Sequence, residues 1–403
     1  MNQANINLAI LGHKPAFEQP VPVGQLYFPS WERYEESMQG IFERQYYNNN
    51  GPLHEELERK LEDFFDVKHV ICVLNATMGL MIVTDALSLT GKVLVPAFTF
   101  PASIQAIIYA GAEPVLCDVD LKSHHLCIKA VEKHLKQGSI EAIMAVNLWG
   151  DVADIDALEA LSSKYNTQLY FDSAQAVGCK FNGTPVGNFG SAEVFSFHAT
   201  KILNATEGGC ICTNDDNLAA KLRAIRPSYY PNTEAVPIKR VANARMSEMQ
   251  AAVALMSLED FPVNRANNET LYNQYQQFIQ AMDGIEIVQH KRVSDSNYQY
   301  VVCRIDEQAF GLSRDDLIEV LQAENILARR YFYPGLHQSK PYVEKFKEMS
   351  DSLTNTDILN ASCIQLPLGA KVDSEKIEVI CSIISCAQKN STKITHLLAK
   401  EKS

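Results

Sequence analysis

Residues 192–209 read AEVFSFHATKILNATEGG, and the interpretation of the whole chain starts from this stretch. A strand-like run, 194–197, leads to a single lysine, Lys201, and then through Glu207-Gly208-Gly209 to a second strand-like run, 210–213. An ammonium group between two core strands is unfavourable unless its charge is paired or removed. Lys201 therefore either lies on a solvated loop, as most lysines do, or serves chemistry that removes its charge.

Strand-like and helix-like segments alternate on both sides of this stretch, and the strands are almost continuously hydrophobic. This pattern is typical of parallel strands that are joined by right-handed helical crossovers and covered on both faces. We predict an α/β fold with a large, mixed but mostly parallel sheet flanked by helices. The expected strands are 69–74, 92–96, 113–119, 140–148, 168–172, 193–197 and 209–214, the last two pairing antiparallel at one edge. The expected helices are 31–45, 53–65, 76–87, 101–111, 128–137, 154–165, 217–225, 246–258 and 263–282.

The alternation stops near residue 260, and the 403-residue chain is long enough for two domains. We predict a large domain over residues 1–260, with an irregular and helical N-terminal segment, and a smaller C-terminal α+β domain over residues 261–403. The second domain combines expected strands with helices at 314–324 and 374–386. The last fifteen residues are polar and are expected to be loosely held.

The composition excludes several classes of protein. A net charge of −12 and a pI near 5.4 argue against a nucleic-acid partner. The ten cysteines form no CxxC pair and lie mostly in apolar runs, so they are interpreted as reduced core residues and no metal site is expected. The N-terminal residues lack the pattern of a signal peptide, and no apolar run reaches membrane-spanning length. The expected location is the cytoplasm, without a membrane partner.

Polar or aromatic residues follow several predicted strands of the first domain, at the edge where open α/β sheets bind ligands. Each has a structural interpretation as well, as a helix cap, a core aromatic ring or an ion pair. Together they match the needs of pyridoxal 5′-phosphate: a lysine for its aldehyde, a carboxylate for its ring nitrogen, an aromatic neighbour, and amide or hydroxyl groups for its phosphate. The residues that supply these groups are Lys201, Asp172, Phe100, Ala76, Thr77 and Ser196.

Longer motifs then identify a family. The runs Phe171-Asp172-Ser173-Ala174-Gln175, Ser196-Phe197-His198-Ala199-Thr200-Lys201 and Glu207-Gly208-Gly209 resemble the DegT/DnrJ/EryC1/StrS sugar aminotransferases, which have the fold of type I pyridoxal-phosphate enzymes. The resemblance extends over nearly the whole chain. Further segments that carry it are Asn49–Pro52, Val95–Phe100, Leu148–Gly150, Asn243–Glu248 and Arg329–His337.

The resemblance implies roles for individual residues. Lys201 would form the Schiff base with the cofactor and move the proton, and Asp172 would pair with the pyridine nitrogen. Gln175 would lie near the cofactor's 3-hydroxyl, and Phe100 would stack on its ring. The phosphate would be held by Ala76, Thr77 and Ser196, joined by Asn243 from a second subunit, so a homodimer with shared active sites is expected.

Two contacts with the substrate, through Arg330 and His337, are also implied by the resemblance. Two positions differ from the usual family pattern: Val241 stands where glycine is common, and Gln175 stands where close relatives often carry histidine. The first difference makes a different shape of the loop before Asn243 possible.

The expected reaction is a transamination from L-glutamate to a nucleotide-linked 4-keto-6-deoxyhexose. Within the family, the SFHATK and ARRYFYPG segments are most similar to enzymes that make dTDP-4-amino-4,6-dideoxyglucose. A 3-keto nucleotide sugar or another cyclic ketone is an alternative substrate, and a pyridoxal-phosphate-binding regulator without turnover is an alternative function. A dehydratase of the same fold would carry histidine at position 201, and a nicotinamide enzyme would show GxGxxG after the first strand.

Overall fold

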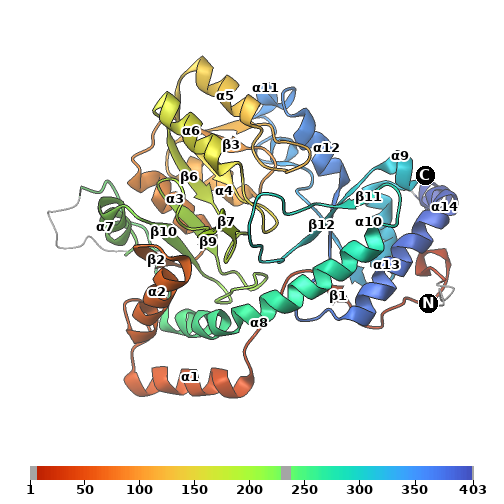
Figure 1. Cartoon of the computed structure of the whole chain (residues 1–403), viewed down its shortest axis with the longest axis horizontal. Helices are drawn as coiled ribbons and strands as arrows, with labels where there is room; N and C mark the ends of the chain where they lie inside the picture. Colours follow the sequence, from red (N-terminus) through yellow and green to blue (C-terminus); the bar gives the residue numbers. More distant parts are fainter. Residues whose placement is uncertain (1–6, 228–236, 402–403) are drawn as a thin grey trace.

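The computed structural model describes residues 7–227 and 237–401. At its centre lies a seven-stranded sheet with the strand order β2-β10-β9-β6-β5-β3-β4 (Figure 1). All neighbouring strands are parallel except β10, which runs antiparallel to both β9 and β2. The strands are β2 (His69–Val73), β3 (Lys92–Pro96), β4 (Glu113–Cys117), β5 (Ile140–Val146), β6 (Gln168–Asp172), β9 (Glu193–Ser196) and β10 (Gly209–Thr213). The predicted mostly parallel α/β sheet is confirmed, and β2 occupies the edge outside the antiparallel pair.

Helices cover both faces of this sheet, because successive side chains of each strand point to opposite sides. In β2, Val70 and Cys72 pack under one set of helices, while Ile71 and Val73 pack under the other. The first set comprises α2 (Pro52–Phe65), α5 (Ile128–Gln137), α6 (Ile155–Tyr165) and the first half of α8 (Glu248–Ile279). The second set comprises α3 (Ala76–Ala86), α4 (Pro101–Tyr109) and α7 (Asp216–Ile225).

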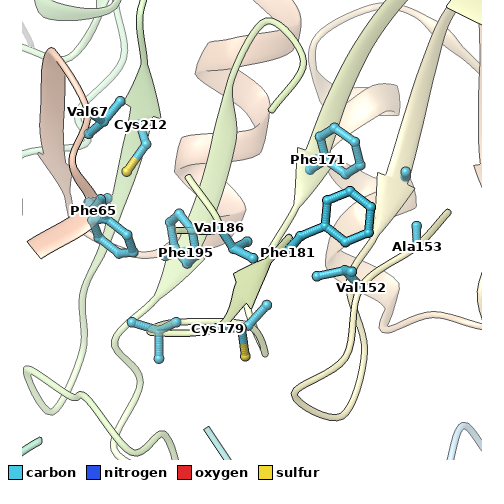
Figure 2. Packing of buried hydrophobic residues seen from close by; sticks show 14 of the residues in the cluster. Phe65, Val67, Val152, Ala153, Phe171, Cys179, Phe181, Val186, Phe195 and Cys212 are labelled. Carbon is cyan, nitrogen blue, oxygen red and sulfur yellow. The ribbon is translucent and has the colours of Figure 1, made fainter. Parts of the chain in front are cut away.

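Aromatic side chains fill the space between α2 and the sheet. The rings of Phe65 in α2 and Phe195 in β9 stack with centroids 4.5 Å apart, and both residues are fully buried (Figure 2). Burying one such side chain stabilises the fold by about 1.5–3 kcal/mol. This contact fixes α2 against the strand that leads directly to Lys201.

A second, four-stranded antiparallel sheet has the order β11-β12-β15-β14. One of its faces packs against helices that together form a separate core, and the other face is turned toward the large sheet. Its strands are β11 (Ile285–Ile287), β12 (Val301–Ile305), β15 (Cys363–Leu366) and β14 (Arg329–Arg330). The helices on its core side are α10 (Arg314–Ala323), α13 (Ser374–Lys389) and α14 (Ser391–Glu401).

Helix α8 joins the two cores as one continuous element (Figure 1). The prediction of two separate helices, at 246–258 and 263–282, is therefore wrong, because the structure has a single helix there. Pro262 lies inside the helix, where it removes one hydrogen bond. Side chains before it pack in the large core and those after residue 270 pack in the second core, and this packing on both sides stabilises the helix through the proline. The boundary predicted near residue 260 falls inside this helix, and the division into two domains stays a proposal.

The C-terminal residues also differ from the prediction. Helix α14 packs on the second core through the buried side chains of Ile394 and Leu398, so this segment is held by apolar burial although its composition is mostly polar. At the other end of the chain, Leu8 and Val21 belong to the same core. No helix in the described part of the chain is long and apolar enough to cross a membrane.

Short elements complete the structure between the main strands and helices. They are η1 (Ala9–Leu11), β1 (Val21–Pro22), α1 (Trp31–Arg44), β7 (Lys180–Phe181), β8 (Thr184–Pro185), α9 (Glu307–Phe310), β13 (Ile326–Leu327), η2 (Leu336–Gln338), α11 (Lys347–Ser350) and α12 (Thr354–Ser362). Strand β1 pairs in parallel with β13, which ties the N-terminal segment to the second core.

Candidate active site

A cavity of about 420 Å³ lies at the carboxyl ends of β3, β5, β6 and β9. This is the position at which parallel sheets bind ligands, because the loops that leave the strands meet there. Seven of the residues predicted for the site line this one cavity. They are Ala76, Thr77, Phe100, Asp172, Gln175, Ser196 and Lys201.

Lys201 lies in the turn between β9 and β10, and its side chain is half-buried. The Nζ atom donates a hydrogen bond to the phenolic oxygen of Tyr300, 2.8 Å away. Burial lowers the pKa of the Lys201 amine, and the nearby Tyr331 and Asp172 oppose that shift. The surroundings thus favour the neutral, nucleophilic amine more than water does.

The backbone around Lys201 is held by two other parts of the chain. The Ile202 amide donates to Oε1 of Gln299 at 2.8 Å, and the Gln25 amide donates to the carbonyl oxygen of Thr200 at 3.1 Å. Gln25 and Gln299 are themselves buried and hydrogen-bonded to each other. The turn therefore has a fixed backbone, which limits where the lysine side chain can reach.

Asp172 ends β6, and its side chain is buried. Its Oδ2 atom accepts a hydrogen bond from Ser103 Oγ at 2.7 Å, and Oδ1 accepts one from the Ala174 amide at 3.2 Å. Burial raises the pKa of the Asp172 carboxyl above its usual range, although these hydrogen bonds and the charge of Lys201 lower it. A cation placed beside this carboxylate would relieve the unfavourable burial of its charge.

The N-terminus of α3 opens on the same cavity. Asn75 caps this helix by accepting a hydrogen bond from the Met78 amide at 2.9 Å, so the preceding amides of Ala76 and Thr77 are left for another acceptor. Strand β10 passes close to this helix start: a Cβ on Gly209 would lie 2.9 Å from the Ala76 nitrogen and 2.5 Å from the Phe195 carbonyl oxygen. Glycine at this position therefore permits the close packing that places the helix start at the cavity.

Gln175 and Phe100 lie at the same cavity in different ways. The Oε1 atom of Gln175 accepts a hydrogen bond from the Trp149 amide at 2.9 Å, which fixes the orientation of its side chain. The Phe100 side chain is 61% exposed, so its ring is available for a stacking partner.

Three predicted site residues do not line the cavity. Asn243 has its Oδ1 atom 3.2 Å from Nε of Arg245, which donates a hydrogen bond to it. Arg330 forms an ion pair with Asp315 at 2.6 Å. His337 is buried, with Nε2 2.8 Å from a carboxylate oxygen of Asp357. The predicted contacts of these three residues with a partner subunit or a substrate stay predictions.

The second core contributes cavity residues that the sequence did not reveal. Tyr300, Arg329 and Tyr331 all line the cavity, and burial raises the pKa of Tyr331 to about 12. They lie about one hundred residues or more after Lys201 in the chain. The sequence contains one feature that could have indicated these residues, a pair of arginines followed by three aromatic residues at 329–333. Only the pairing of the folded strand shows which of the two arginines faces the cavity.

A mostly parallel α/β sheet with a lysine and a buried carboxylate in one cavity is the arrangement expected of a pyridoxal-phosphate aminotransferase. A solved aminotransferase from Brucella abortus has the same fold, with a TM-score of 0.79 and 25% identity. The chain belongs to the DegT/DnrJ/EryC1/StrS aminotransferase family, whose model matches residues 31–385. It is thus a sugar aminotransferase that depends on pyridoxal 5′-phosphate.

Individual relatives resemble the chain over most of its length. The dTDP-4-amino-4,6-dideoxy-D-glucose transaminase of Shigella dysenteriae is 31% identical over 370 residues, which cover 91% of this chain and 99% of that protein. The GDP-perosamine synthase of Caulobacter vibrioides is 31% identical over 335 residues, covering 82% and 88%. The crystal structure of DesI with its TDP-sugar product matches with a TM-score of 0.89 and 34% identity, covering 98% of this chain and 99% of DesI.

The side chains around the cavity fit the cofactor of this family. The buried carboxylate of Asp172 is available to a protonated ring nitrogen, and the Lys201 amine is available to an aldehyde. The free amides at the start of α3 suit a phosphate group, and the exposed ring of Phe100 suits stacking on a flat heterocycle. No cluster of metal-ligating side chains occurs within residues 7–227 and 237–401.

Proposed function

We propose that this enzyme transfers the amino group of L-glutamate to C4 of a nucleotide-linked 4-keto-6-deoxyhexose. The proposed acceptor is dTDP-4-dehydro-6-deoxy-D-glucose, and the product is the corresponding 4-amino-4,6-dideoxy sugar. The observation that carries this proposal is the 31% identity, across 91% of the chain, to a transaminase named for that product. The similarity to DesI, whose crystal structure was obtained with its TDP-sugar product, supports the same choice of nucleotide.

When bound, pyridoxal 5′-phosphate supplies an aldehyde that takes up an amino group and a ring that draws electrons from the adjacent carbon. Lys201 would supply the amine that holds the cofactor and then move a proton through its Nζ atom. The lowered pKa of this amine suits the role, because a neutral amine can accept a proton. Asp172 would keep the ring nitrogen protonated, while Ser103 and the Ala174 amide orient its two carboxylate oxygens.

The proposal also includes a homodimer. Asn243 lies outside the lining of the cavity in the single chain, on the segment that leads into α8. In a dimer, this segment of one subunit would reach the phosphate end of the partner's cavity, near the start of α3. Each active site would then need residues from both chains.

A panel of nucleotide ketosugars tests the substrate. The purified enzyme, loaded with cofactor and supplied with L-glutamate, is incubated with dTDP- and GDP-linked 4-keto-6-deoxy sugars and with a dTDP-linked 3-keto-6-deoxy sugar. We expect the dTDP-linked 4-keto sugar to give the highest kcat/KM, with the new C–N bond at C4 in the NMR spectrum of the product. A new bond at C3, or a preference for the GDP sugar, would contradict the proposed substrate.

A GDP-linked sugar is the second candidate, because the GDP-perosamine synthase of Caulobacter vibrioides has the same 31% identity, although over a smaller part of the chain.

The amino donor is checked separately, in the first half of the reaction. L-Glutamate alone, without any sugar, should convert the bound cofactor to its amine form and release 2-oxoglutarate. The absence of this half-reaction with every amino acid tested would favour a binding protein without turnover.

A further inference from the structure

Gln299, just before β12, contacts both loops of the large sheet that supply Lys201 and Gln175. Its Oε1 atom accepts a hydrogen bond at 2.8 Å from the amide of Ile202, the residue directly after the lysine. Its Nε2 atom lies 3.5 Å from the carbonyl oxygen of Gln175, and Asn297 Nδ2 donates to the same oxygen at 3.0 Å. One short segment of the second core therefore connects the backbones of two loops at the cavity.

The N-terminal segment holds Gln299 from the other side. Gln25 Nε2 donates to the carbonyl oxygen of Gln299 at 3.0 Å, and Asn268 Nδ2 of α8 donates to Gln25 Oε1 at 2.8 Å. The backbone amide of Gln25 donates to the carbonyl oxygen of Thr200, the residue directly before Lys201, at 3.1 Å. The same two glutamines thus hold the backbone on both sides of the lysine. Gln25 itself lies before residue 31, where the match to the family begins.

These amide side chains are buried in a place where apolar side chains would also fill the space. Each of them is at most 3% exposed; they are Gln25, Asn268, Asn297 and Gln299. A buried amide is unfavourable unless it is hydrogen-bonded, and a hydrogen bond fixes distance and direction more strictly than apolar contact does. The network therefore restricts the position of the lysine turn relative to the loop of Gln175, in addition to packing the two cores together.

We propose that Gln299 is a positioning residue for the transamination, which keeps the Lys201 amine at the place where it can carry a proton. This inference rests on the proposed function, in which Lys201 moves the proton. Proton transfer requires hydrogen-bond reach, and a displacement of about 1 Å can lower a rate by about 100-fold. Because Gln299 acts through the backbone of the turn, its loss should affect the rate of the reaction and not the binding of the donor. Gln25 acts one step further away, so its effect should be smaller.

The test compares Gln299→Met and Gln25→Met with Tyr275→Phe. Methionine keeps a long unbranched side chain and removes the amide. Tyr275 is the matched control, because it is fully buried in the second core and donates one hydrogen bond, to the Pro367 carbonyl oxygen at 2.9 Å, without lining the cavity. A single turnover of the cofactor-loaded enzyme with saturating L-glutamate gives a rate constant and an amplitude, and calorimetry gives the Kd for glutarate. Hydrogen exchange of the apoenzyme reports on the Ile202 amide independently of the cofactor.

We expect Gln299→Met to lower the rate constant by about 10- to 100-fold. The amplitude and the Kd for glutarate should stay within about threefold, and deuterium on the α-carbon of glutamate should slow the variant at least as much as it slows the wild type. The rate constant of Gln25→Met should fall by about three- to tenfold, and that of Tyr275→Phe should not change. In the apoenzyme, the Ile202 amide should exchange at least about tenfold faster in Gln299→Met, because it loses its acceptor, and at the wild-type rate in Tyr275→Phe.

A wild-type rate constant in Gln299→Met, or a loss of amplitude alone, would assign this residue to stability and overturn the inference. Loss of the deuterium effect would place the defect in another step and would also overturn it. If Gln299→Met does not fold, Gln25→Met decides, and an unchanged rate constant in that variant contradicts the inference. Failure of the proposed function has a separate signature, because Lys201→Ala would then keep the wild-type rate constant. Failure of the inference alone leaves Lys201→Ala inactive and Gln299→Met unimpaired.

Discussion

The Nζ atom of Lys201 and the phenolic oxygen of Tyr300 lie 2.8 Å apart, although 99 positions separate them in the chain. The two residues belong to different sheets: the lysine follows a strand of the large sheet, and the tyrosine precedes β12 of the small one. The contact therefore couples the reacting amine to the second core. It also gives a partly buried amine a hydrogen-bond partner that carries no charge.

Tyr300→Phe removes this partner and leaves the ring in place. An ammonium that loses a hydrogen-bond acceptor is less well stabilised, so the pKa of the Lys201 amine should fall further below its usual range. We expect the glutamate half-reaction to slow by about tenfold, which corresponds to the net free energy of one hydrogen bond. The pH dependence of the rate at which the apoenzyme takes up pyridoxal 5′-phosphate, together with the pH–rate profile of the half-reaction, measures the shift. Tyr298→Phe serves as the control, and a fall in rate without any change of pH profile would assign Tyr300 to packing alone.

Asp172→Asn separates function from stability. Affinity for pyridoxal 5′-phosphate and turnover should fall by about 10- to 1,000-fold, because an adjacent opposite charge shifts a pKa by about one to three units. Burial raises the pKa of Asp172, so the folded apoprotein is penalised at neutral pH for holding the ionised form. The variant apoprotein should therefore be at least as stable as the wild type at pH 7. This advantage should disappear below about pH 4, where the carboxyl group is protonated in both the folded and unfolded states. Thermal unfolding of both apoproteins, compared with cofactor titrations, provides the check.

The buried carboxyl group of Glu193 should make the stability of the fold depend on pH. It is fully buried at the start of β9, where Ser173 Oγ and the Gly187 and Phe189 amides donate to its carboxylate, and burial raises its pKa to about 7. The folded state holds this proton more tightly than the unfolded state, so stability should be lost as the pH rises from about 4.5 to 7. The loss amounts to about 3 kcal/mol, because folding raises the pKa of this carboxyl group from its ordinary value near 4.5 to about 7.

Glu193→Gln removes this titration. The free energy of unfolding in urea, measured at several pH values between 4 and 8, should rise in the variant relative to wild type as the pH increases. Glu286→Gln removes an exposed carboxylate and provides the comparison. An equal difference between variant and wild type at pH 4.5 and at pH 8 would show that Glu193 does not titrate in this range.

Mixed dimers test whether Asn243 acts across subunits. Lys201→Ala and Asn243→Asp subunits, each inactive as a homodimer, are co-expressed with different affinity tags and the heterodimer is isolated. If sites are shared, one of the two sites in the heterodimer combines the intact lysine of one subunit with the intact asparagine of the other, and activity returns. If each site is built from a single chain, both sites carry a defect and the heterodimer stays inactive. The mass of the wild-type enzyme in solution, from light scattering, accompanies this measurement.

The large sheet and its site residues were accessible from the sequence for a physical reason. Asp172 interrupts an apolar run, and such an interruption in a doubly covered parallel sheet occurs where the strand leaves the core. Lys201 follows β9 in the same way, and Ala76 follows the cap of α3. Because the carboxyl ends of parallel strands meet at one edge, these separate positions predicted a single cavity, which the structure contains.

The contribution of the second core could not be predicted by the same reasoning. Arg329 and Arg330 are chemically identical neighbours, and only the pairing of Arg329 with Gln365 decides which one faces the cavity. The resemblance to the family implied a substrate contact for Arg330, which stays a prediction; in the structure this residue forms an ion pair with Asp315. Likewise, two separate helices were predicted at 246–258 and 263–282, but packing against two cores keeps α8 continuous.

Continuity of α8 has a practical meaning for redesign. Chimeras that exchange the C-terminal portion between relatives, in order to change which ketosugar is accepted, are commonly joined where a domain border is expected. A junction near residue 260 would join two halves of one helix that come from different proteins. The apolar side chains of both halves would then have to point toward the cores that they pack against. Crossover within residues 280–284, after the helix ends and before β11 begins, avoids this mismatch and carries Tyr300 and Arg329 together into the hybrid.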